Sequence, residues 1–235
     1  MIITRNQLRR MIHEAITPQP VIYCDMDGVL ADFALVAISI VNSILDGHRP
    51  DITTSSKSTR RSIRKLHREL GPDWRVASDD DLDIMPVRGI MMSVIGRRAG
   101  EHFRDLPPLA DGVNELWPYI NSLGLKVMLL SAPIPSREGI SADEGKTIWA
   151  MQHLIPKPGI DDIIITPSME KQLYAVGATQ NVLIDDKPRT IDQWNEAGGI
   201  GILHVTGDSA STISQLDDIF GRRKPDRFMY QDLDG

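Results

Sequence analysis

The sequence predicts an α/β protein with a doubly wound, mainly parallel sheet and a small helical cap inserted after the first strand. Three observations carry this prediction. Short runs rich in Val, Ile and Leu recur along the chain, as they do in parallel strands that are buried on both faces. Segments with helical periodicity separate most of these runs. Between the first two runs, residues 34–103 contain no strand pattern, although a crossover connection needs only about a dozen residues.

Five apolar runs are expected to form the strands, and they cover residues 21–24, 125–130, 162–165, 181–184 and 201–205. The helices expected between them cover residues 111–123, 143–154, 168–176 and 189–197. Alternation of strand and helix is typical of a sheet that carries helices on both faces. These segments form a predicted core of residues 18–33 and 104–220.

The long interval after the first strand predicts a cap of residues 34–103 over the C-terminal edge of the sheet. Helical patterns occupy residues 34–45 and 58–70. An acidic turn is expected in the stretch ASDDDLD, and a further helix over residues 88–101.

The segments at the two ends of the chain are predicted separately. Residues 1–17 have apolar side chains at helical spacing, which predicts an amphipathic helix for packing or for contact with a second copy of the chain. Targeting or attachment to a surface is the alternative, because arginines lie beside the apolar face. Residues 221–235 are expected to form a polar tail. A homodimer is therefore one expectation.

The amino-acid composition and net charge of the chain limit the classes of partner that it is expected to bind. The chain of 235 residues is 41% hydrophobic and 25% charged, with a formal net charge of −6. This balance gives no broad electrostatic reason to bind nucleic acid or an anionic membrane, so neither partner is expected, although the sequence leaves room for a local basic pocket.

The single cysteine, Cys24, excludes an intrachain disulfide and is expected to pack in the core. No apolar run approaches the roughly 18 residues that span a bilayer, and we expect a soluble protein of the cytoplasm, the host's if a virus encodes it.

Polar side chains follow the ends of three predicted strands. Two acids and a glycine come after the first strand, a serine after the second and an acidic pair after the fourth: Asp25, Asp27, Gly28, Ser131, Asp185 and Asp186. Glycine permits a sharp turn or the close approach of a ligand. Because ligands of open α/β sheets bind beyond the carboxyl ends of the strands, these groups are expected to meet in one crevice.

Clustered aspartates require a compensating positive charge. Two like charges about 4 Å apart repel by about 4 kcal/mol at an effective dielectric constant of about 20. A set of oxygen ligands without nearby His or Cys favours Mg²⁺, and this ion would also attract a phosphate group. Lys171, on a predicted helix, is expected to supply a further positive charge to phosphate oxygens, with Lys146 and Lys187 as the alternatives.

In their order along the chain, DMDGV, LLSAP, the lysine and LIDDKP resemble the four motifs of the haloacid dehalogenase (HAD) superfamily of phosphohydrolases. Within that superfamily, DMDGVLADF, FRDLPPLADGVNELWPYINSLG and LIDDKPRTIDQWNEAGG look like the 5'(3')-deoxyribonucleotidases, which act on nucleoside monophosphates. The resemblance covers nearly the whole core and is poor through residues 45–95. It implies a Mg²⁺-dependent phosphomonoesterase for (deoxy)ribonucleoside monophosphates, whose cap selects the substrate.

The resemblance also implies roles for individual residues. Asp25 would be the nucleophile that forms an aspartyl-phosphate, and Asp27 the general acid and base. The metal ligands implied are Asp25, the backbone carbonyl of Asp27, Asp186 and, directly or through orientation, Asp185. The phosphate contacts implied are Ser131, Ala132, Lys171 and Gly28.

Substrate contacts in the cap are less closely specified by the sequence. Phe33, by the family pattern, contacts the nucleoside, although an aromatic side chain there also suits the core. Trp74 is a candidate for stacking on a base, with packing as the alternative. Lys146, on the helix after the second motif, is a further candidate for the site. For Lys171 the alternative is solvation, the usual state of a lysine on a helix. Asp32 is expected to be a local capping group.

Two other functions stay open. One is a HAD phosphatase for another small phosphorylated metabolite or for a nucleic-acid 3'-phosphate end. The other is a non-enzymatic phospho-accepting or binding module. Receiver modules place an acidic pair first and a single phosphorylated Asp later, whereas here the DxD motif comes first, and a long cap is foreign to a receiver.

Overall fold

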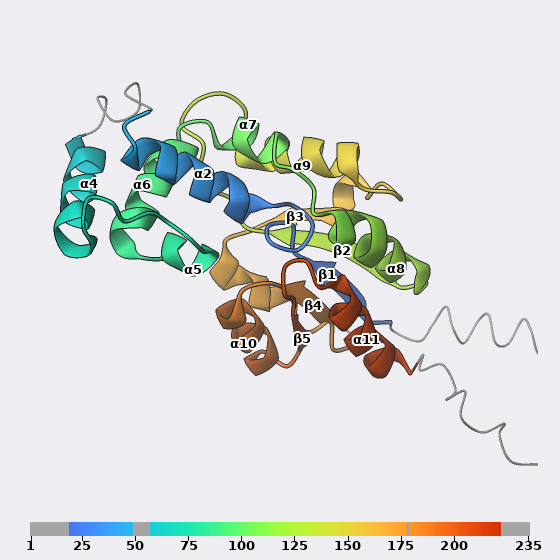
Figure 1. Cartoon of the computed structure of the whole chain (residues 1–235). Coiled ribbons are helices and arrows are strands. Elements are labelled where there is room, and N and C mark those ends of the chain that lie inside the picture. Colours follow the sequence, from blue (N-terminus) through green and yellow to red (C-terminus); the bar gives the residue numbers. More distant parts are fainter. Residues whose placement is uncertain (1–18, 49–56, 178, 222–235) are drawn as a thin grey trace, which may run out of the picture.

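The computed structural model describes residues 19–48, 57–177 and 179–221. Within them the sheet has five parallel strands in the order β3-β2-β1-β4-β5 (Figure 1). The strands are β1 (Val21–Cys24), β2 (Lys126–Ser131), β3 (Ile163–Ile165), β4 (Val182–Asp185) and β5 (Ile200–Leu203). The predicted doubly wound α/β architecture is confirmed. The helix predicted over residues 1–17 and the tail predicted beyond residue 221 lie outside the described residues.

The strand order creates a crevice at the end of β1. From β1 the chain reaches β2 and β3 on one side, and β4 and β5 on the other. Cys24 at the end of β1 lies beside Leu129 of β2 and Ile184 of β4. The residues that follow β1 therefore emerge between the ends of two strands that lead to opposite halves of the sheet. This is the position at which doubly wound proteins bind ligands.

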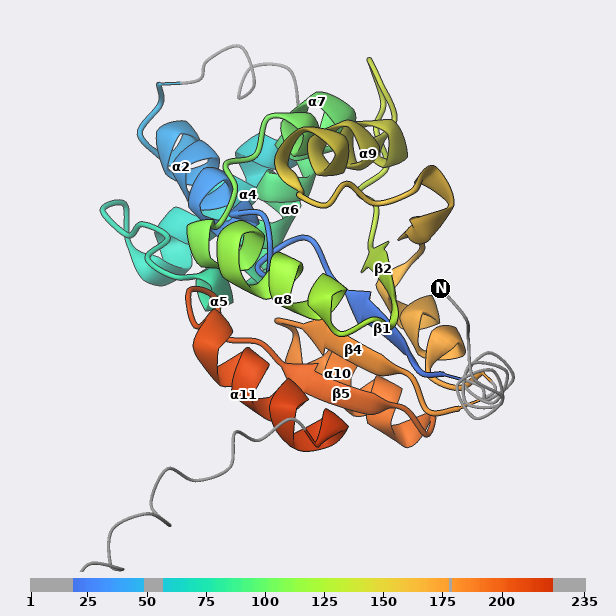
Figure 2. The same cartoon turned by 90° about the vertical axis from the view of Figure 1, so that its right-hand side faces the viewer.

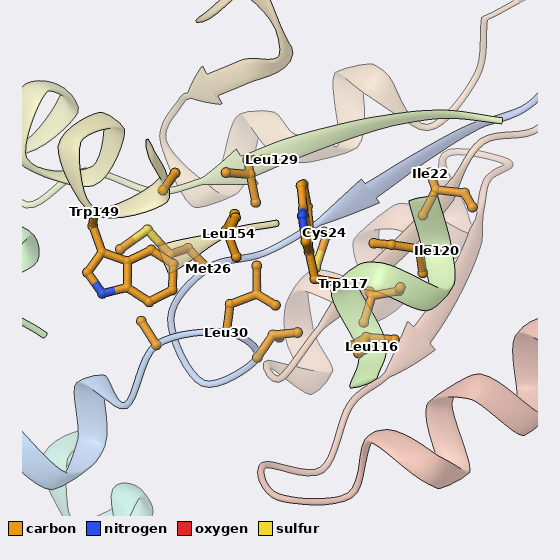
Figure 3. Packing of buried hydrophobic residues seen from close by; sticks show 14 of the residues in the cluster. Ile22, Cys24, Met26, Leu30, Leu116, Trp117, Ile120, Leu129, Trp149 and Leu154 are labelled. Atoms are coloured by element: carbon orange, nitrogen blue, oxygen red, sulfur yellow. The ribbon is translucent and has the colours of Figure 1, made fainter. Parts of the chain in front are cut away.

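Helices cover both faces of the sheet because side chains of β1 alternate between two apolar clusters. Ile22 and Cys24 point into one cluster with Trp117, and Cys24 is fully buried there, as expected (Figure 3). This face is covered by α8 (Trp117–Ser122) and α11 (Ser209–Phe220) (Figure 2). Tyr23 points into the opposite cluster with Trp194, which belongs to α10 (Pro188–Glu196).

The interval after β1 forms a helical cap with its own apolar cluster, at the left of Figure 1. The cap contains α2 (Phe33–Leu45), α4 (Lys57–Leu70), α5 (Asp79–Leu82) and α6 (Met85–Ile95). The prediction of an acidic turn in ASDDDLD is wrong in part, because residues of this stretch form α5. The carboxylate of Asp81 accepts the backbone N–H of Ser78 and so caps the first turn.

The single helix expected over residues 88–101 is also wrong. The structure divides it into α6 and α7 (Ala99–Arg104). The backbone carbonyls of Gly96 and Arg97 accept N–H groups of Arg137 and Glu138, from the loop after β2. The chain leaves the helical path at Gly96 because these tertiary hydrogen bonds replace the helical ones.

Helix α7 packs against α9 (Ala142–His153) rather than within the cap cluster. A Cβ atom built on Gly145 of α9 would lie 2.0 Å from the carbonyl oxygen of Gly100 in α7. Only glycine permits this approach of two helix backbones. Ala99 and Phe103 of α7 consequently join the main core, and Lys146, next to Gly145, is held at a fixed position beneath the cap.

The remaining helical segments differ in detail from the prediction. The helix expected over residues 111–123 begins as a π-helical turn, η1 (Gly112–Leu116), before α8. Pro118 accounts for this widening because it has no N–H to donate to the preceding turn. The segment predicted over residues 168–176 is the 3₁₀ helix η3 (Ser168–Tyr174), and η2 (Ile160–Asp162) precedes β3. Helix α11 was not predicted.

Candidate active site

The loop after β1 is folded tightly by its own backbone. The Leu30 and Ala31 N–H groups both donate to the carbonyl oxygen of Met26. Gly28 has a φ of 77°, and a Cβ atom built on it would lie 2.3 Å from Oδ2 of Asp186. Glycine is required at this position both for the left-handed backbone and for the contact with Asp186. The turn therefore directs Asp25 and Asp27 toward the carboxyl edge of the sheet.

Three aspartates form a carboxylate cluster at this edge. Asp25, Asp185 and Asp186 each place an oxygen within 4.8 Å of the others. Asp185 is fully buried, and burial together with the charge of Asp25 raises its pKa to about 6. The same causes raise the pKa of Asp186 to about 7. The cluster favours an added positive charge, and its oxygen donors fit a hard divalent cation such as Mg²⁺.

Lys171 neutralises part of this charge. Its Nζ atom lies 2.7 Å from Oδ2 of Asp185 and 3.0 Å from Oδ2 of Asp25. The residue belongs to η3 and is almost fully buried. Burial alone would lower the pKa of Lys171, but the charges of Asp25 and Asp185 outweigh it and raise the pKa above its usual value. Lys171 is thus a fixed cation beside the carboxylate cluster.

A second buried lysine holds Asp27. The Nζ atom of Lys146 lies 2.6 Å from Oδ2 of Asp27 and 2.7 Å from Oγ of Ser131, and 4.0 Å from the centre of the Phe103 ring. The other oxygen of Asp27, Oδ1, has no hydrogen-bond partner among the described residues. Burial raises the pKa of Asp27, although the charge of Lys146 opposes the shift. Asp27 therefore has one oxygen held by Lys146 and one that is buried without a partner among the described residues.

The structure brings together most of the residues that the sequence singles out. Asp25, Asp185, Asp186 and Lys171 form one group, and Asp27, Ser131 and Lys146 form a second beside it. Lys146 therefore lies beside Asp27 and Ser131. Solvation, the alternative for Lys171, is excluded because that side chain is buried. The side chain of Asp27 is bound to Lys146 rather than placed within the carboxylate cluster.

A cavity of about 730 Å³ lies between the core and the cap. Of the residues named from the sequence, those that line it are Asp27, Gly28, Asp32, Phe33, Ala132, Asp186 and Lys187. Trp74 does not line it and instead packs against the apolar cluster of the cap. Asp32 accepts the Leu35 N–H at 3.0 Å, which confirms its predicted capping role at the start of α2.

Several lining residues were missed in the sequence. Met91, Met92 and Arg88 of α6 form the cap wall, and Arg189 and Thr206 belong to the core wall. Thr206 follows β5 and donates its hydroxyl hydrogen to the carbonyl oxygen of Gly28 at 2.8 Å. Its position after a strand was a usable signal. The methionines gave none, because their spacing on a helix is the same for packing and for lining.

One ion pair joins the cap to the site. The Nζ atom of Lys187 lies 2.5 Å from Oδ2 of Asp79 in α5 and 3.4 Å from Oδ2 of Asp186. Lys187 was considered as an alternative to Lys171 for the phosphate site. Its side chain is about half exposed, and it faces the cap instead of the buried part of the carboxylate cluster.

The fold and the site define a doubly wound α/β protein with a capped, acidic site at the carboxyl edge of its sheet. No protein-family model matches the chain, and no curated protein matches it. Solved structures that resemble it include a haloacid dehalogenase-like family hydrolase from Xanthomonas campestris, with 16% identity and a TM-score of 0.46 over 87% of this chain and 94% of that one. A HAD hydrolase of family IA, variant 3, from Entamoeba histolytica has 13% identity and a TM-score of 0.42 over 86% and 90% of the two chains.

A third similar structure is a putative β-phosphoglucomutase from Thermotoga maritima. It is 13% identical, with a TM-score of 0.42, and the match covers 84% of this chain and all of that one.

Within the described residues, no helix combines the length and the apolar character that crossing a bilayer requires.

Proposed function

We propose that the protein is a Mg²⁺-dependent phosphomonoesterase of the HAD type, which hydrolyses (deoxy)ribonucleoside monophosphates through an aspartyl-phosphate. One observation carries the proposal: two acids separated by a single residue are held by two different buried lysines. Asp25 lies against Lys171, while Asp27 lies against Lys146. Two neighbouring carboxylates in different environments are suited to different chemical roles.

Asp25 is the proposed nucleophile. Its Oδ1 atom accepts the Met26 N–H at 2.8 Å, and its Oδ2 atom lies beside Lys171. These contacts orient the carboxylate for attack on phosphorus. The attack forms a bond from a carboxylate oxygen to phosphorus and breaks the bond from phosphorus to the leaving oxygen.

Asp27 is the proposed acid and base. Lys146 fixes one of its oxygens, and the raised pKa favours a proton on the carboxyl group. The carboxyl group of Asp27, a residue that lines the cavity, then gives this proton to the leaving oxygen of the nucleoside. In the second step the ionised Asp27 accepts a proton from the water that attacks the aspartyl-phosphate, which releases phosphate and restores Asp25.

The positive groups of the site would hold the phosphate. Asp25, Asp185, Asp186 and the backbone carbonyl of Asp27 would hold Mg²⁺, which when bound stabilises negative charge on phosphate oxygens. Lys171 supplies a second positive charge at the same place. The proposed uncharged contacts are Ser131, Ala132 and Gly28.

The cavity supports a leaving group larger than a simple alcohol. Its volume of about 730 Å³ greatly exceeds what a phosphate group alone occupies. Phe33, Met91 and Met92 give it apolar and polarisable walls, which suit the flat face of a nucleobase. Trp74, which packs within the cap, is not part of this proposal.

The proposal is tested by phosphate release from a substrate panel. The panel contains the common nucleoside 5'- and 3'-monophosphates, several sugar phosphates and a 3'-phosphorylated oligonucleotide, each with Mg²⁺ and with a chelator. We expect Mg²⁺-dependent release from nucleoside monophosphates. Release from sugar phosphates alone would overturn the nucleotidase assignment and keep the chemistry. A stable phosphoprotein without turnover would favour the receiver-type alternative.

A further inference from the structure

The outer face of α4 concentrates positive charge in an otherwise acidic protein. On one side of the helix, Thr59 and Leu66 are buried, and Oγ of Thr59 lies 3.0 Å from Oγ of Ser93 in α6. The opposite side carries six exposed cations: Lys57, Arg60, Arg61, Arg64, Lys65 and Arg68. At 3.6 residues per turn, these six side chains lie within an arc of about 140°. The helix is therefore apolar toward the cap, and the arc that holds the six cations is basic.

Among the residues that the structure describes, few acids neutralise these cations. Glu69 is the one acid of α4, and it lies 3.9 Å from Lys65. Within the described part of the chain, Lys65 is the only one of the six with a carboxylate partner. Arginines elsewhere on the surface do have such partners, as in the pairs Arg98–Glu101 and Arg104–Asp105. A face that served only for solvation would be expected to mix the two signs in the same way.

We propose that this face of α4 binds the phosphate backbone of a nucleic acid. Four of the six cations are arginines, whose planar guanidinium groups match phosphate oxygens in two-point hydrogen bonds. From Lys57 to Lys65 and Arg68 the face runs along the helix axis for about 16 Å, long enough to follow several phosphates of one strand. The net charge of −6 conceals this surface, because it averages a basic helix with an acidic remainder.

The arrangement of α4 argues for a nucleic acid over a membrane. A helix that lies in a membrane interface presents apolar side chains to the lipid. Here Leu66 faces the cap, and Ile63 packs against the same apolar cluster. The outward arc contains only charged side chains, which can contact phosphates but have nothing to insert into a bilayer.

The surface is separate from the catalytic cavity. Helix α4 packs against α6, and α6 contributes Arg88, Met91 and Met92 to the cavity wall (Figure 1). A strand bound to the outer face of α4 would thus lie on the far side of α6 from the carboxylate cluster. The inference rests on the distribution of charge and does not require the proposed phosphatase activity.

The test is binding of the full chain to a fluorescently labelled 20-nucleotide single strand and to its duplex, measured by anisotropy at several NaCl concentrations. The variant R61Q/R64Q/R68Q removes three charges from the centre of the face. We expect at least a tenfold rise in Kd at low salt. The slope of log Kd against log salt should fall by about 2 to 3, as expected when three phosphate contacts are lost.

The matched control is R97Q/R98Q/R137Q, which removes three charges from exposed arginines outside α4. We expect its Kd to remain within about twofold of the wild-type value, and circular dichroism should show that both variants are folded. Equal losses in the two variants, or no loss in the α4 variant, would overturn the proposal. So would binding to phosphatidylserine vesicles or to an acidic protein without binding to either nucleic acid.

Discussion

The two walls of the cavity are built from different interactions. On the core side, Lys171 and Asp185 lie behind the residues that line the cavity. Both are almost completely buried, and Nζ of Lys171 lies 2.7 Å from Oδ2 of Asp185. On the cap side, Arg88 and Asp83 lie 3.1 Å apart, and more than half of each side chain is exposed. Removing one partner of a buried pair typically costs about 3 to 5 kcal/mol, whereas an exposed pair contributes about 1 kcal/mol or less. The core wall is therefore rigidly specified and the cap wall is tolerant of change.

This difference suggests separate tasks for the two walls, the reaction for the core wall and the choice of substrate for the cap wall. The core wall presents charges that the chain cannot lose without leaving another charge buried and unpaired. The cap wall presents Met91 and Met92 from α6, and methionine side chains adapt easily to the shape of a ligand. We infer that substitutions in the core wall stop the reaction, while substitutions in the cap wall change which phosphate ester is used.

The largest effect is expected from Asp25→Asn. The amide cannot form an aspartyl-phosphate, so turnover should fall by about four orders of magnitude or more. Phosphate release under saturating substrate measures the loss, and thermal unfolding checks the fold. Asp208→Asn is the control, because it removes a charge from a residue outside the cavity lining while asparagine still caps α11. Activity close to wild type in Asp25→Asn would contradict the proposed nucleophile.

Asp27→Asn is expected to have the second-largest effect. It removes the acid and the base while leaving Asp25 in place, which should slow nucleotide hydrolysis by about 10² to 10⁴. The first step should be less impaired with p-nitrophenyl phosphate, whose leaving group needs no proton. Phosphoenzyme should then accumulate and be visible by mass spectrometry after acid quenching. Equal slowing of both substrates without phosphoenzyme would argue against the acid and base role.

The same contrast between the walls explains how much could be predicted from the sequence. The strands were predicted to within two residues, because a buried parallel strand reads as a continuous apolar run. Asp25, Asp27 and Asp185 follow from this, since strand ends place their next residues at one edge. The core side of the site can thus be predicted from local sequence patterns.

The positions of the lysines and of the cap wall could not be predicted in this way. Lys146 reaches Asp27 because Gly145 lets α9 touch α7. This contact joins segments that lie about 45 residues apart in the chain, and the spacing of residues on a single helix cannot reveal it. For Trp74 the sequence left both stacking on a base and packing open, and the side chain packs against the apolar cluster of the cap. Such outcomes depend on tertiary packing of helices whose apolar faces are interchangeable in sequence.

A smaller effect, on the free energy of unfolding, is expected where α7 meets α2. There the ring of His102 in α7 packs edge-on against the ring of Phe33 in α2, with 5.6 Å between the ring centres. Burial, with the nearby charge of Lys146, lowers the pKa of His102 from 6.5 to about 4. The unfolded chain therefore binds more protons than the folded one between these pH values. The free energy of unfolding should fall as the pH drops from about 6.5 to about 4, by up to about 3 kcal/mol from this group.

Urea unfolding of the wild type and His102→Phe between pH 4 and pH 8 isolates this contribution. Phenylalanine keeps a ring against Phe33 and cannot titrate. The stability difference between the two proteins should shift in favour of the variant as the pH falls, and it should be constant above about pH 7. Parallel pH profiles for the two proteins would show that His102 does not titrate in this interval.

The smallest effect, and the most direct probe of the cap, is expected from Met92→Ala. Met92 lines the cavity and is only partly buried, so its truncation should cost little stability. If the cap wall holds the leaving group, KM for a nucleoside monophosphate should rise roughly tenfold, the usual scale for a lost apolar contact. KM for acetyl phosphate, which does not reach α6, should stay within about twofold. An equal rise for both substrates would mean that the cap acts on the phosphate site itself, and the division between a chemical wall and a selective wall would then be wrong.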